Sequence, residues 1–165
     1  MPTHPPQPRR PAAHPQPVLQ RLALAWTLGL CSGAIALAQP APASDDLAAQ
    51  VLAEVNRYRQ AQQLPPLQAA PWLATLAAEH SADMARLGGL SHAGFQDRFQ
   101  RARRQTCVEN LAAGYSQASR LLAGWRGSPG HHQNLLDARV QEVGVASVNG
   151  HVTWLACSAD GPPGR

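Results

Sequence analysis

The stretch VQEVGVASVNGHVTWLACS, residues 140–158, decides the fold class of this 165-residue chain. Hydrophobic residues alternate with polar or small ones on both sides of the pair Asn149-Gly150, which is the pattern of a β-hairpin closed by a two-residue turn. The segments that precede it are patterned like helices instead. Helices followed by an antiparallel hairpin are typical of an α+β domain.

Several segments upstream of the hairpin carry hydrophobic residues at helical spacing. Ser44, a good N-cap residue, marks the start of the first, and Pro65-Pro66 stops it. Gly88-Gly89 closes the second. The expected helices cover about residues 45–62, 71–87, 96–103 and 117–127. The string CVENLAAG, residues 107–114, fits either a strand or a turn.

Residues 1–38 have the pattern of a secretory signal peptide. A basic, proline-rich lead is followed by an apolar run, LALAWTLGLCSGAIALA at residues 22–38, which ends in the small-residue pattern A-x-A. The run is short for a membrane span, which needs roughly 20 apolar residues, and Gly29 and Gly33 interrupt it. We therefore expect cleavage after Ala38, with an uncleaved membrane anchor as the alternative.

Cleavage there leaves enough chain for one packed core. Residues 39–46 are expected to form a linker, residues 47–158 the folded domain and residues 159–165 a flexible tail. The chain has no lysine and is rich in alanine and arginine, which indicates a bacterial, GC-rich coding bias. We expect a secreted or periplasmic bacterial protein that is a monomer and has no membrane span once it is mature.

The formal net charge of +4 does not indicate a nucleic-acid partner. Three of the fourteen basic residues lie within residues 1–38, so the mature chain is nearly neutral. One basic cluster remains at residues 98–104, but it is short and Phe99 is its only aromatic residue. We expect this cluster to be a solvent-exposed helix face and exclude nucleic acid as a partner.

Cys107 and Cys157 are the cysteines that remain when residues 1–38 are removed. An even pair in an exported protein indicates a disulfide, and two free thiols are the alternative. The bond would close a loop of about fifty residues, which is worth about 4 kcal/mol in the chain-entropy model.

The string SPGHHQNLL, residues 128–136, places two adjacent histidines at a helix start. Ser128 is a good N-cap residue and Pro129 fits the first helical position, but a helix start explains neither His131 nor His132. Neighbouring helical residues point about 100° apart, so at most one of the pair faces a given cleft. The positive end of the helix favours the neutral, metal-competent form of His131. Two partly exposed histidines without a role are the alternative.

Three more titratable residues are candidates for a site or for the core. His92, in LSHAG, follows the glycines that close a helix and therefore lies in a loop, where functional residues concentrate. Glu109, in CVENL, has apolar neighbours, and a buried acid requires a partner. His80 lies on an apolar helix face, so we expect a structural histidine with Asp83, one turn on, as its partner.

Taken together, these strings resemble the bacterial branch of the CAP superfamily, which takes in cysteine-rich secretory proteins, antigen 5 and pathogenesis-related 1 proteins. The resemblance rests on LSHAG, ENLAAG, GWRGSPGHHQNLL and TWLACSAD, in the right order within residues 47–158. It implies a three-layer α-β-α sandwich with a small antiparallel sheet. It also implies a cleft with two histidines and two glutamates, whose histidines bind a divalent metal, usually zinc, in some members.

Carried over to this chain, the resemblance makes His92 and His131 the cleft histidines and Glu109 the first glutamate, with His132 turned away. The place of the second glutamate, three residues after the tryptophan of the motif, is Ser128 here. Two histidines and one glutamate can still hold zinc together with water, but catalysis by paired carboxylates is not expected.

Two hypotheses for function follow. In the first, the domain is a binding module whose cleft, lined by His92, Glu109, Ser128 and His131, receives a lipid, peptide or cell-envelope ligand. In the second, the domain is a zinc-dependent hydrolase with Glu109 as its base. The sequence has no G-x-S-x-G elbow, no HExxH and no phosphate loop, which favours the binding module. A purely structural role in the cell envelope is a third reading, and whether the chain is an enzyme stays open.

Overall fold

A four-stranded sheet lies at the centre of residues 44–161, which are the part of the chain that this computed structural model describes. The helices are α1 (Ser44–Ala61), α2 (Pro71–Leu87), α3 (Phe95–Ala102), α4 (Ala118–Gly127) and α5 (Pro129–Leu135). The strands are β1 (Gln68–Ala69), β2 (Cys107–Ala113), β3 (Glu142–Val148) and β4 (His151–Cys157). The signal peptide predicted for residues 1–38 and parts of the predicted linker and tail lie outside the described residues.

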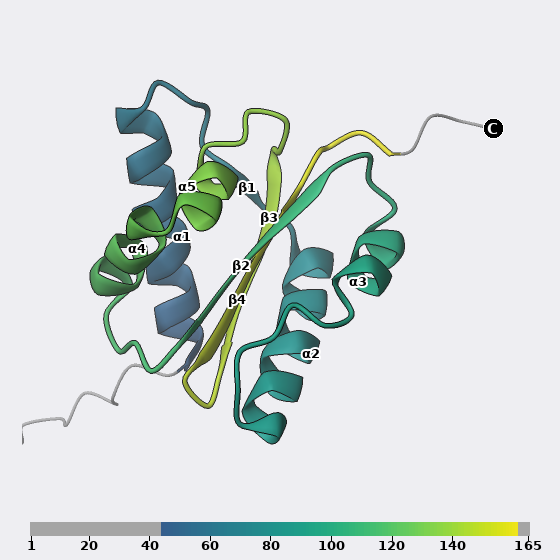
Figure 1. Cartoon of the computed structure of the whole chain (residues 1–165). Helices are drawn as coiled ribbons and strands as arrows, with labels where there is room; N and C mark the ends of the chain where they lie inside the picture. Colours follow the sequence, from purple (N-terminus) through teal and green to yellow (C-terminus); the bar gives the residue numbers. More distant parts are fainter. Residues whose placement is uncertain (1–43, 162–165) are drawn as a thin grey trace, which may run out of the picture. The chain divides into compact units, whose positions relative to one another are not determined.

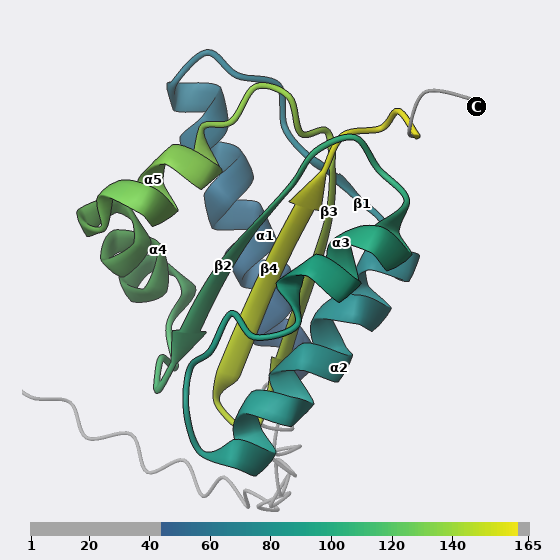
Figure 2. The same ribbon diagram turned by 45° about the vertical axis from the view of Figure 1, so that its right-hand side comes forward.

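Helices cover both faces of this sheet. Figure 1 shows α1, α4 and α5 on one face and α2 and α3 on the other, and Figure 2 shows the same arrangement with β2 at one side of the sheet. The three-layer α-β-α sandwich expected from the resemblance is therefore confirmed. None of the helices in residues 44–161 is both long enough and apolar enough to cross a membrane.

The sheet has the order β1-β3-β4-β2. The predicted hairpin is confirmed: β3 and β4 pair antiparallel with Val148 opposite His151, and both turn residues, Asn149 and Gly150, have positive φ as a tight hairpin turn requires. The segment left open between strand and turn is strand β2, antiparallel to β4. The small antiparallel sheet of β2, β3 and β4 is thus as expected, and the two-residue strand β1 adds a parallel pairing with β3 that the sequence did not predict.

Side chains of β4 alternate between two hydrophobic clusters, as the period of a strand dictates. Val152, Trp154 and Ala156 pack in the cluster beneath α1 and α4, whereas Leu155 and Cys157 pack in the one beneath α2 and α3. Every one of these five residues is buried. The central strand is thus covered on both faces, and β1 and β2 are the two edge strands of the sheet.

The predicted disulfide is confirmed. Cys107 and Cys157 are bonded, with an S–S distance of 2.03 Å, and they are direct partners in the register of β2 and β4. The bond joins the first residue of β2 to the last residue of β4, two residues before Glu109. It therefore fixes the end of the edge strand that carries the candidate glutamate.

A buried arginine in α1 fixes the position of α5. Arg59 donates hydrogen bonds from Nη1 to the carbonyl oxygens of Leu135 (2.8 Å) and Asp137 (3.1 Å), and from Nε to that of Pro65 (3.0 Å). Burial lowers the pKa of this guanidinium, and nearby Asp137 opposes the change. Because α5 carries His131, this arginine helps to place one half of the candidate site.

Two sequence-based expectations about boundaries and surfaces need correction. The first helix begins at Ser44, so the last three residues of the predicted 39–46 linker belong to α1. The basic cluster at residues 98–104 is not a solvent-exposed face throughout. Arg98 is buried, and Arg104 pairs with Glu142 at 2.8 Å while its guanidinium lies over a tryptophan ring.

Candidate functional site

The two predicted cleft histidines come from opposite layers of the sandwich and meet beside β2. His92 lies in the segment between α2 and α3, and His131 lies in the first turn of α5. Their ring centroids are 6.4 Å apart and the ring planes are inclined by 45°. A pocket of about 450 Å³ opens here, and both histidines, Glu109 and Ser128 line it. The structure therefore brings the four predicted cleft residues to one place.

Glu109 forms the buried support of His92. Its Oε1 accepts hydrogen bonds from His92 Nδ1 (2.9 Å) and Arg98 Nη2 (2.8 Å), and its Oε2 accepts one from Arg98 Nε (2.8 Å). The glutamate side chain is only 2% exposed. A carboxylate that is paired with arginine accepts only, so His92 donates from Nδ1, and in the neutral ring Nε2 is the atom that can accept a hydrogen bond or bind a metal.

Arg98 is the partner that Glu109 requires, and sequence reasoning did not identify it. The guanidinium engages the carboxylate through two nitrogens, which is a strong and geometrically specific contact. Its Nη1 also donates to the carbonyl oxygen of Ala93 (3.0 Å), the residue after His92. One signal was available: Arg98 follows Phe95 by three residues and precedes Ala102 by four, so it shares the apolar face of α3.

The start of α5 holds His131 against the edge strand. Asn110 Nδ2 donates to the carbonyl oxygen of His131 (3.0 Å), and Asn134 Nδ2 donates to that of Glu109 (3.1 Å). Ser128 occupies the predicted N-cap position, but its side chain makes no capping hydrogen bond. Burial, and then the charge of His92, lower the pKa of His131, which favours its neutral ring.

His132 takes a different direction from its neighbour. Its Nε2 lies 2.7 Å from the hydroxyl oxygen of Tyr58 in α1, and the two rings are 5.9 Å apart. The pocket beside β2 is lined by His131 and not by His132. Because consecutive helical residues point about 100° apart, the imidazole of His131 lies beside β2, whereas that of His132 lies against α1.

His80 is buried in α2 and supports the segment that carries His92. Its Nε2 lies 2.8 Å from the carbonyl oxygen of Ser91, to which it donates. The prediction of Asp83 as its partner is wrong, since Asp83 pairs with Arg86 at 3.0 Å. Burial is the main cause that lowers the pKa of His80, followed by the charge of Arg98.

A divalent metal fits this donor set only in part. Among the described residues, no three His, Cys, Asp or Glu side chains stand close enough to hold a metal ion together. Zn–N bonds of about 2.0–2.1 Å place two rings that share one ion with centroids roughly 6 Å apart or less. The 6.4 Å between the ring centroids of His92 and His131 is slightly beyond that limit, so the two rings would have to move closer together before both could bind one ion.

Comparison with known proteins adds independent evidence. Residues 52–157 match the family model described as the cysteine-rich secretory protein family, CAP. No curated protein matches the chain. Among solved structures, an extracellular protein containing an SCP domain from Bacillus anthracis is similar, with a TM-score of 0.66 and 30% identity. That alignment covers 70% of this chain and 41% of the other.

Two further bacterial structures share the fold. A cysteine-rich secretory protein from Staphylococcus aureus has a TM-score of 0.66 and 16% identity, covering 72% of this chain and 40% of that one. An outer surface protein from Borrelia burgdorferi has a TM-score of 0.65 and 17% identity, covering 72% of this chain and 97% of that one. The chain thus spans about two fifths of the length of the first two structures.

Proposed function

The chain belongs to the cysteine-rich secretory protein (CAP) family, and we propose that it is an extracellular binding module whose ligand occupies the pocket between His92 and His131. The main support for this proposal is that the two imidazole rings lie close together beside β2 and that Glu109 holds the ring of His92 in place. The extracellular setting is supported by similar bacterial proteins that are described as extracellular or outer-surface proteins.

The chemistry of the pocket suits a ligand that carries a hydrogen-bond donor. With Nδ1 committed to Glu109, His92 offers the lone pair of Nε2 to a hydroxyl or amide N–H. Phe95 and Val108 supply apolar surface beside it. A lipid head group, a peptide or a fragment of the cell envelope combines these two properties, and we propose this class of ligand.

The same nitrogen atoms suit a divalent metal. His92 Nε2 and a ring nitrogen of His131 would hold it, and the remaining positions would be filled by water, since catalytic and weak sites keep open positions. When bound, such an ion would act as a Lewis acid on an oxygen atom of the ligand. Glu109 would then serve as the outer partner that fixes the orientation of His92.

The zinc-hydrolase alternative is less well supported. A general base must reach the proton that it abstracts, but both carboxylate oxygens of Glu109 accept hydrogen bonds from Arg98 and the side chain is buried. Ser128, Gln133 and Asn134, which also line the pocket, are not bases at neutral pH. We therefore assign Glu109 an orienting role and favour binding over hydrolysis.

Zinc titration by calorimetry tests the site assignment. We expect His92→Ala and His131→Ala each to weaken zinc binding at pH 7.5 by at least roughly tenfold, because each removes one of two protein ligands. His132→Ala is the matched control, since it removes an adjacent imidazole that contacts Tyr58 instead. Binding should also weaken as the pH falls through the histidine range, because protonated imidazole does not ligate.

Two results would contradict this assignment. One is loss of zinc binding in His132→Ala with full binding in His131→Ala. The other is a wild-type protein that binds no zinc, which would reduce the cleft to a hydrogen-bonding site and remove the hydrolase alternative with it. Circular dichroism of each variant shows whether the fold is retained.

Export with cleavage after Ala38 is a separate expectation. It rests on the A-x-A pattern at residues 36–38. N-terminal sequencing of protein recovered from the periplasm or the medium should begin at Gln39. Recovery of the intact chain from the inner membrane would instead identify residues 22–38 as an uncleaved anchor.

A further inference from the structure

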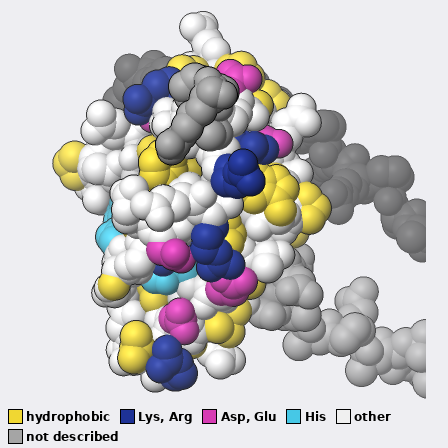
Figure 3. Space-filling view, turned by 90° about the vertical axis from the view of Figure 1, so that its right-hand side faces the viewer, with side chains coloured by type: hydrophobic (Ala, Val, Ile, Leu, Met, Phe, Trp, Pro, Cys, Tyr) yellow, Lys and Arg dark blue, Asp and Glu magenta, His cyan; other side chains and the backbone are white. Residues whose placement is uncertain are grey.

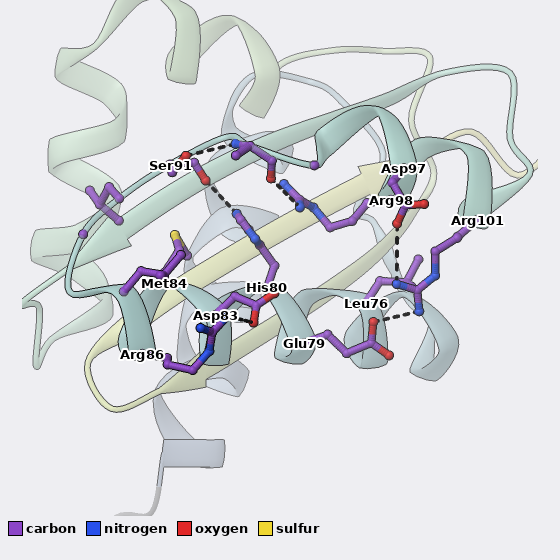
Figure 4. A pocket seen from close by; sticks show the side chains of 15 residues that line it. Leu76, Glu79, His80, Asp83, Met84, Arg86, Ser91, Asp97, Arg98 and Arg101 are labelled. Atoms are coloured by element: carbon purple, nitrogen blue, oxygen red, sulfur yellow. Dashed lines mark hydrogen bonds and ion pairs between the residues drawn. The ribbon is translucent and has the colours of Figure 1, made fainter.

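A second hollow lies on the outer side of the segment that carries His92. It is formed by α2, residues 88–94 and α3, and it has a volume of about 450 Å³, within the roughly 300–1,000 Å³ of ligand pockets. Figure 4 looks into it and shows side chains of α2 and α3 pointing toward one another across it. It shares no lining residue with the pocket beside β2, so it is a separate site.

Hydrophobic side chains line one part of this hollow. Met84 is buried at its base, whereas Leu87 is 71% exposed and Leu90 is 53% exposed. Among the side chains that the structure describes, these two leucines are the large hydrophobic ones left exposed, and both border the same hollow. Exposed hydrophobic surface gathered at a concave site indicates a partner that buries it.

Two polar side chains make the wall rigid. His80 is 5% exposed and Arg98 is 6% exposed, and both line the hollow. His80 holds the carbonyl oxygen of Ser91 and Arg98 holds that of Ala93, so the segment between α2 and α3 is tied on both sides of His92. A preformed wall lowers the ordering cost of binding.

Arg98, which also lines the hollow, is neutralised by Glu109. At one end of the rim the remaining acidic side chains outnumber the basic ones by one. Arg101 lies 2.7 Å from Glu79 and 3.8 Å from Asp97, so two carboxylates share one guanidinium. At the other end, Asp83 and Arg86 balance each other. Figure 3 looks onto this side of the molecule and shows acidic, basic and hydrophobic side chains close together. A cation beside Asp97 would complete the charge balance.

From these contacts we propose that the hollow binds a small amphipathic amine. The aliphatic body lies against Met84, Leu87 and Leu90, and the ammonium group lies beside Glu79 and Asp97. An occupant would also contact Ser91 and so touch the segment that carries His92. This site is distinct from the cleft of the proposed function and does not depend on it.

Three ligands of one chain length test the proposal on the full exported protein: n-hexylamine, n-hexanol and n-hexanoate, titrated at pH 7 and followed by methyl NMR. We expect saturable shifts of the Met84, Leu87 and Leu90 methyl signals. Hexylamine should bind roughly fivefold more tightly than hexanol, the gain of one charge pair near the surface, and hexanoate should bind most weakly.

Two variants and a control make the test specific. Asp97→Asn should abolish the preference for the amine and leave hexanol binding unchanged, while Leu90→Ser should weaken all three ligands. Glu54→Gln removes a carboxylate of α1 that pairs with Arg57. It should change neither the preference for the amine nor the affinity for the three ligands. The proposal is overturned if no ligand gives saturable shifts at these methyls, if hexanoate binds as well as hexylamine, or if Asp97→Asn and Glu54→Gln behave alike.

Discussion

Replacing Arg98 by methionine should lower the free energy of unfolding by about 3–5 kcal/mol, the usual cost of removing one partner from a buried ion pair. The change leaves the buried carboxylate of Glu109 with His92 as its one remaining side-chain partner and frees the carbonyl oxygen of Ala93. Urea denaturation followed by tryptophan fluorescence measures the loss. Zinc affinity should fall by about 10- to 100-fold in the same variant, since His92 loses its orientation.

Two comparisons isolate the cause of this effect. Arg101 lies on the same helix as Arg98, and Arg101→Met removes its exposed pair with Glu79 of α2, which should cost no more than about 1 kcal/mol. The double variant Arg98→Met with Glu109→Leu should recover much of the lost stability, because it removes both buried charges together. If Arg98→Met is no more destabilising than Arg101→Met, the buried pair does not have the role assigned to it.

Gly144→Ala should destabilise the domain by about 3 kcal/mol, at the upper end of the range for overpacking a core. A Cβ atom at this position in β3 would overlap the backbone of Leu73 and Ala74 at the start of α2. Backbone atoms of a helix cannot move aside as a flexible side chain can, so the helix must shift as a whole. Thermal and urea unfolding of the variant measure the effect.

Gly127→Ala is the control for this substitution. A Cβ atom there would meet nothing within 4 Å, and Gly127 lies at the end of α4, so alanine should be neutral or slightly stabilising. Equal stabilities of Gly144→Ala and the wild type would mean that α2 does not pack directly on the backbone of β3.

Local patterns in the sequence were sufficient for the elements with strong periodicity. The pair Asn149-Gly150 fixed the hairpin, and the glycines after Leu87 marked the end of α2. Strand β1 has no recognisable pattern in the sequence, because its two residues, Gln68 and Ala69, are too few to show alternation. Strand β2 is ambiguous in the sequence because its middle residues are buried on both faces, which removes the alternation that identifies a half-exposed strand.

The candidate site was predictable as a set of residues but not as a network of contacts. Family motifs identified His92, Glu109 and His131, whereas the contacts that support them join segments far apart in the chain. Asp83 lies one helical turn from His80 and is therefore the partner that the sequence predicts, but the fold brings a loop carbonyl, that of Ser91, to the ring instead. Arg98 is a charged residue on an apolar helix face. Like a buried acid, such a residue requires a partner of opposite charge.

In the proposed function, His92 and His131 form one binding centre, and Glu109 orients His92 without binding the ligand itself. Anomalous diffraction at the zinc absorption edge, from crystals grown with zinc, locates the ion. We expect a peak about 2.0–2.1 Å from His92 Nε2 and from a ring nitrogen of His131, with Glu109 still bound to Arg98. A peak at His132, or a zinc ion bound directly by the Glu109 carboxylate, would contradict it.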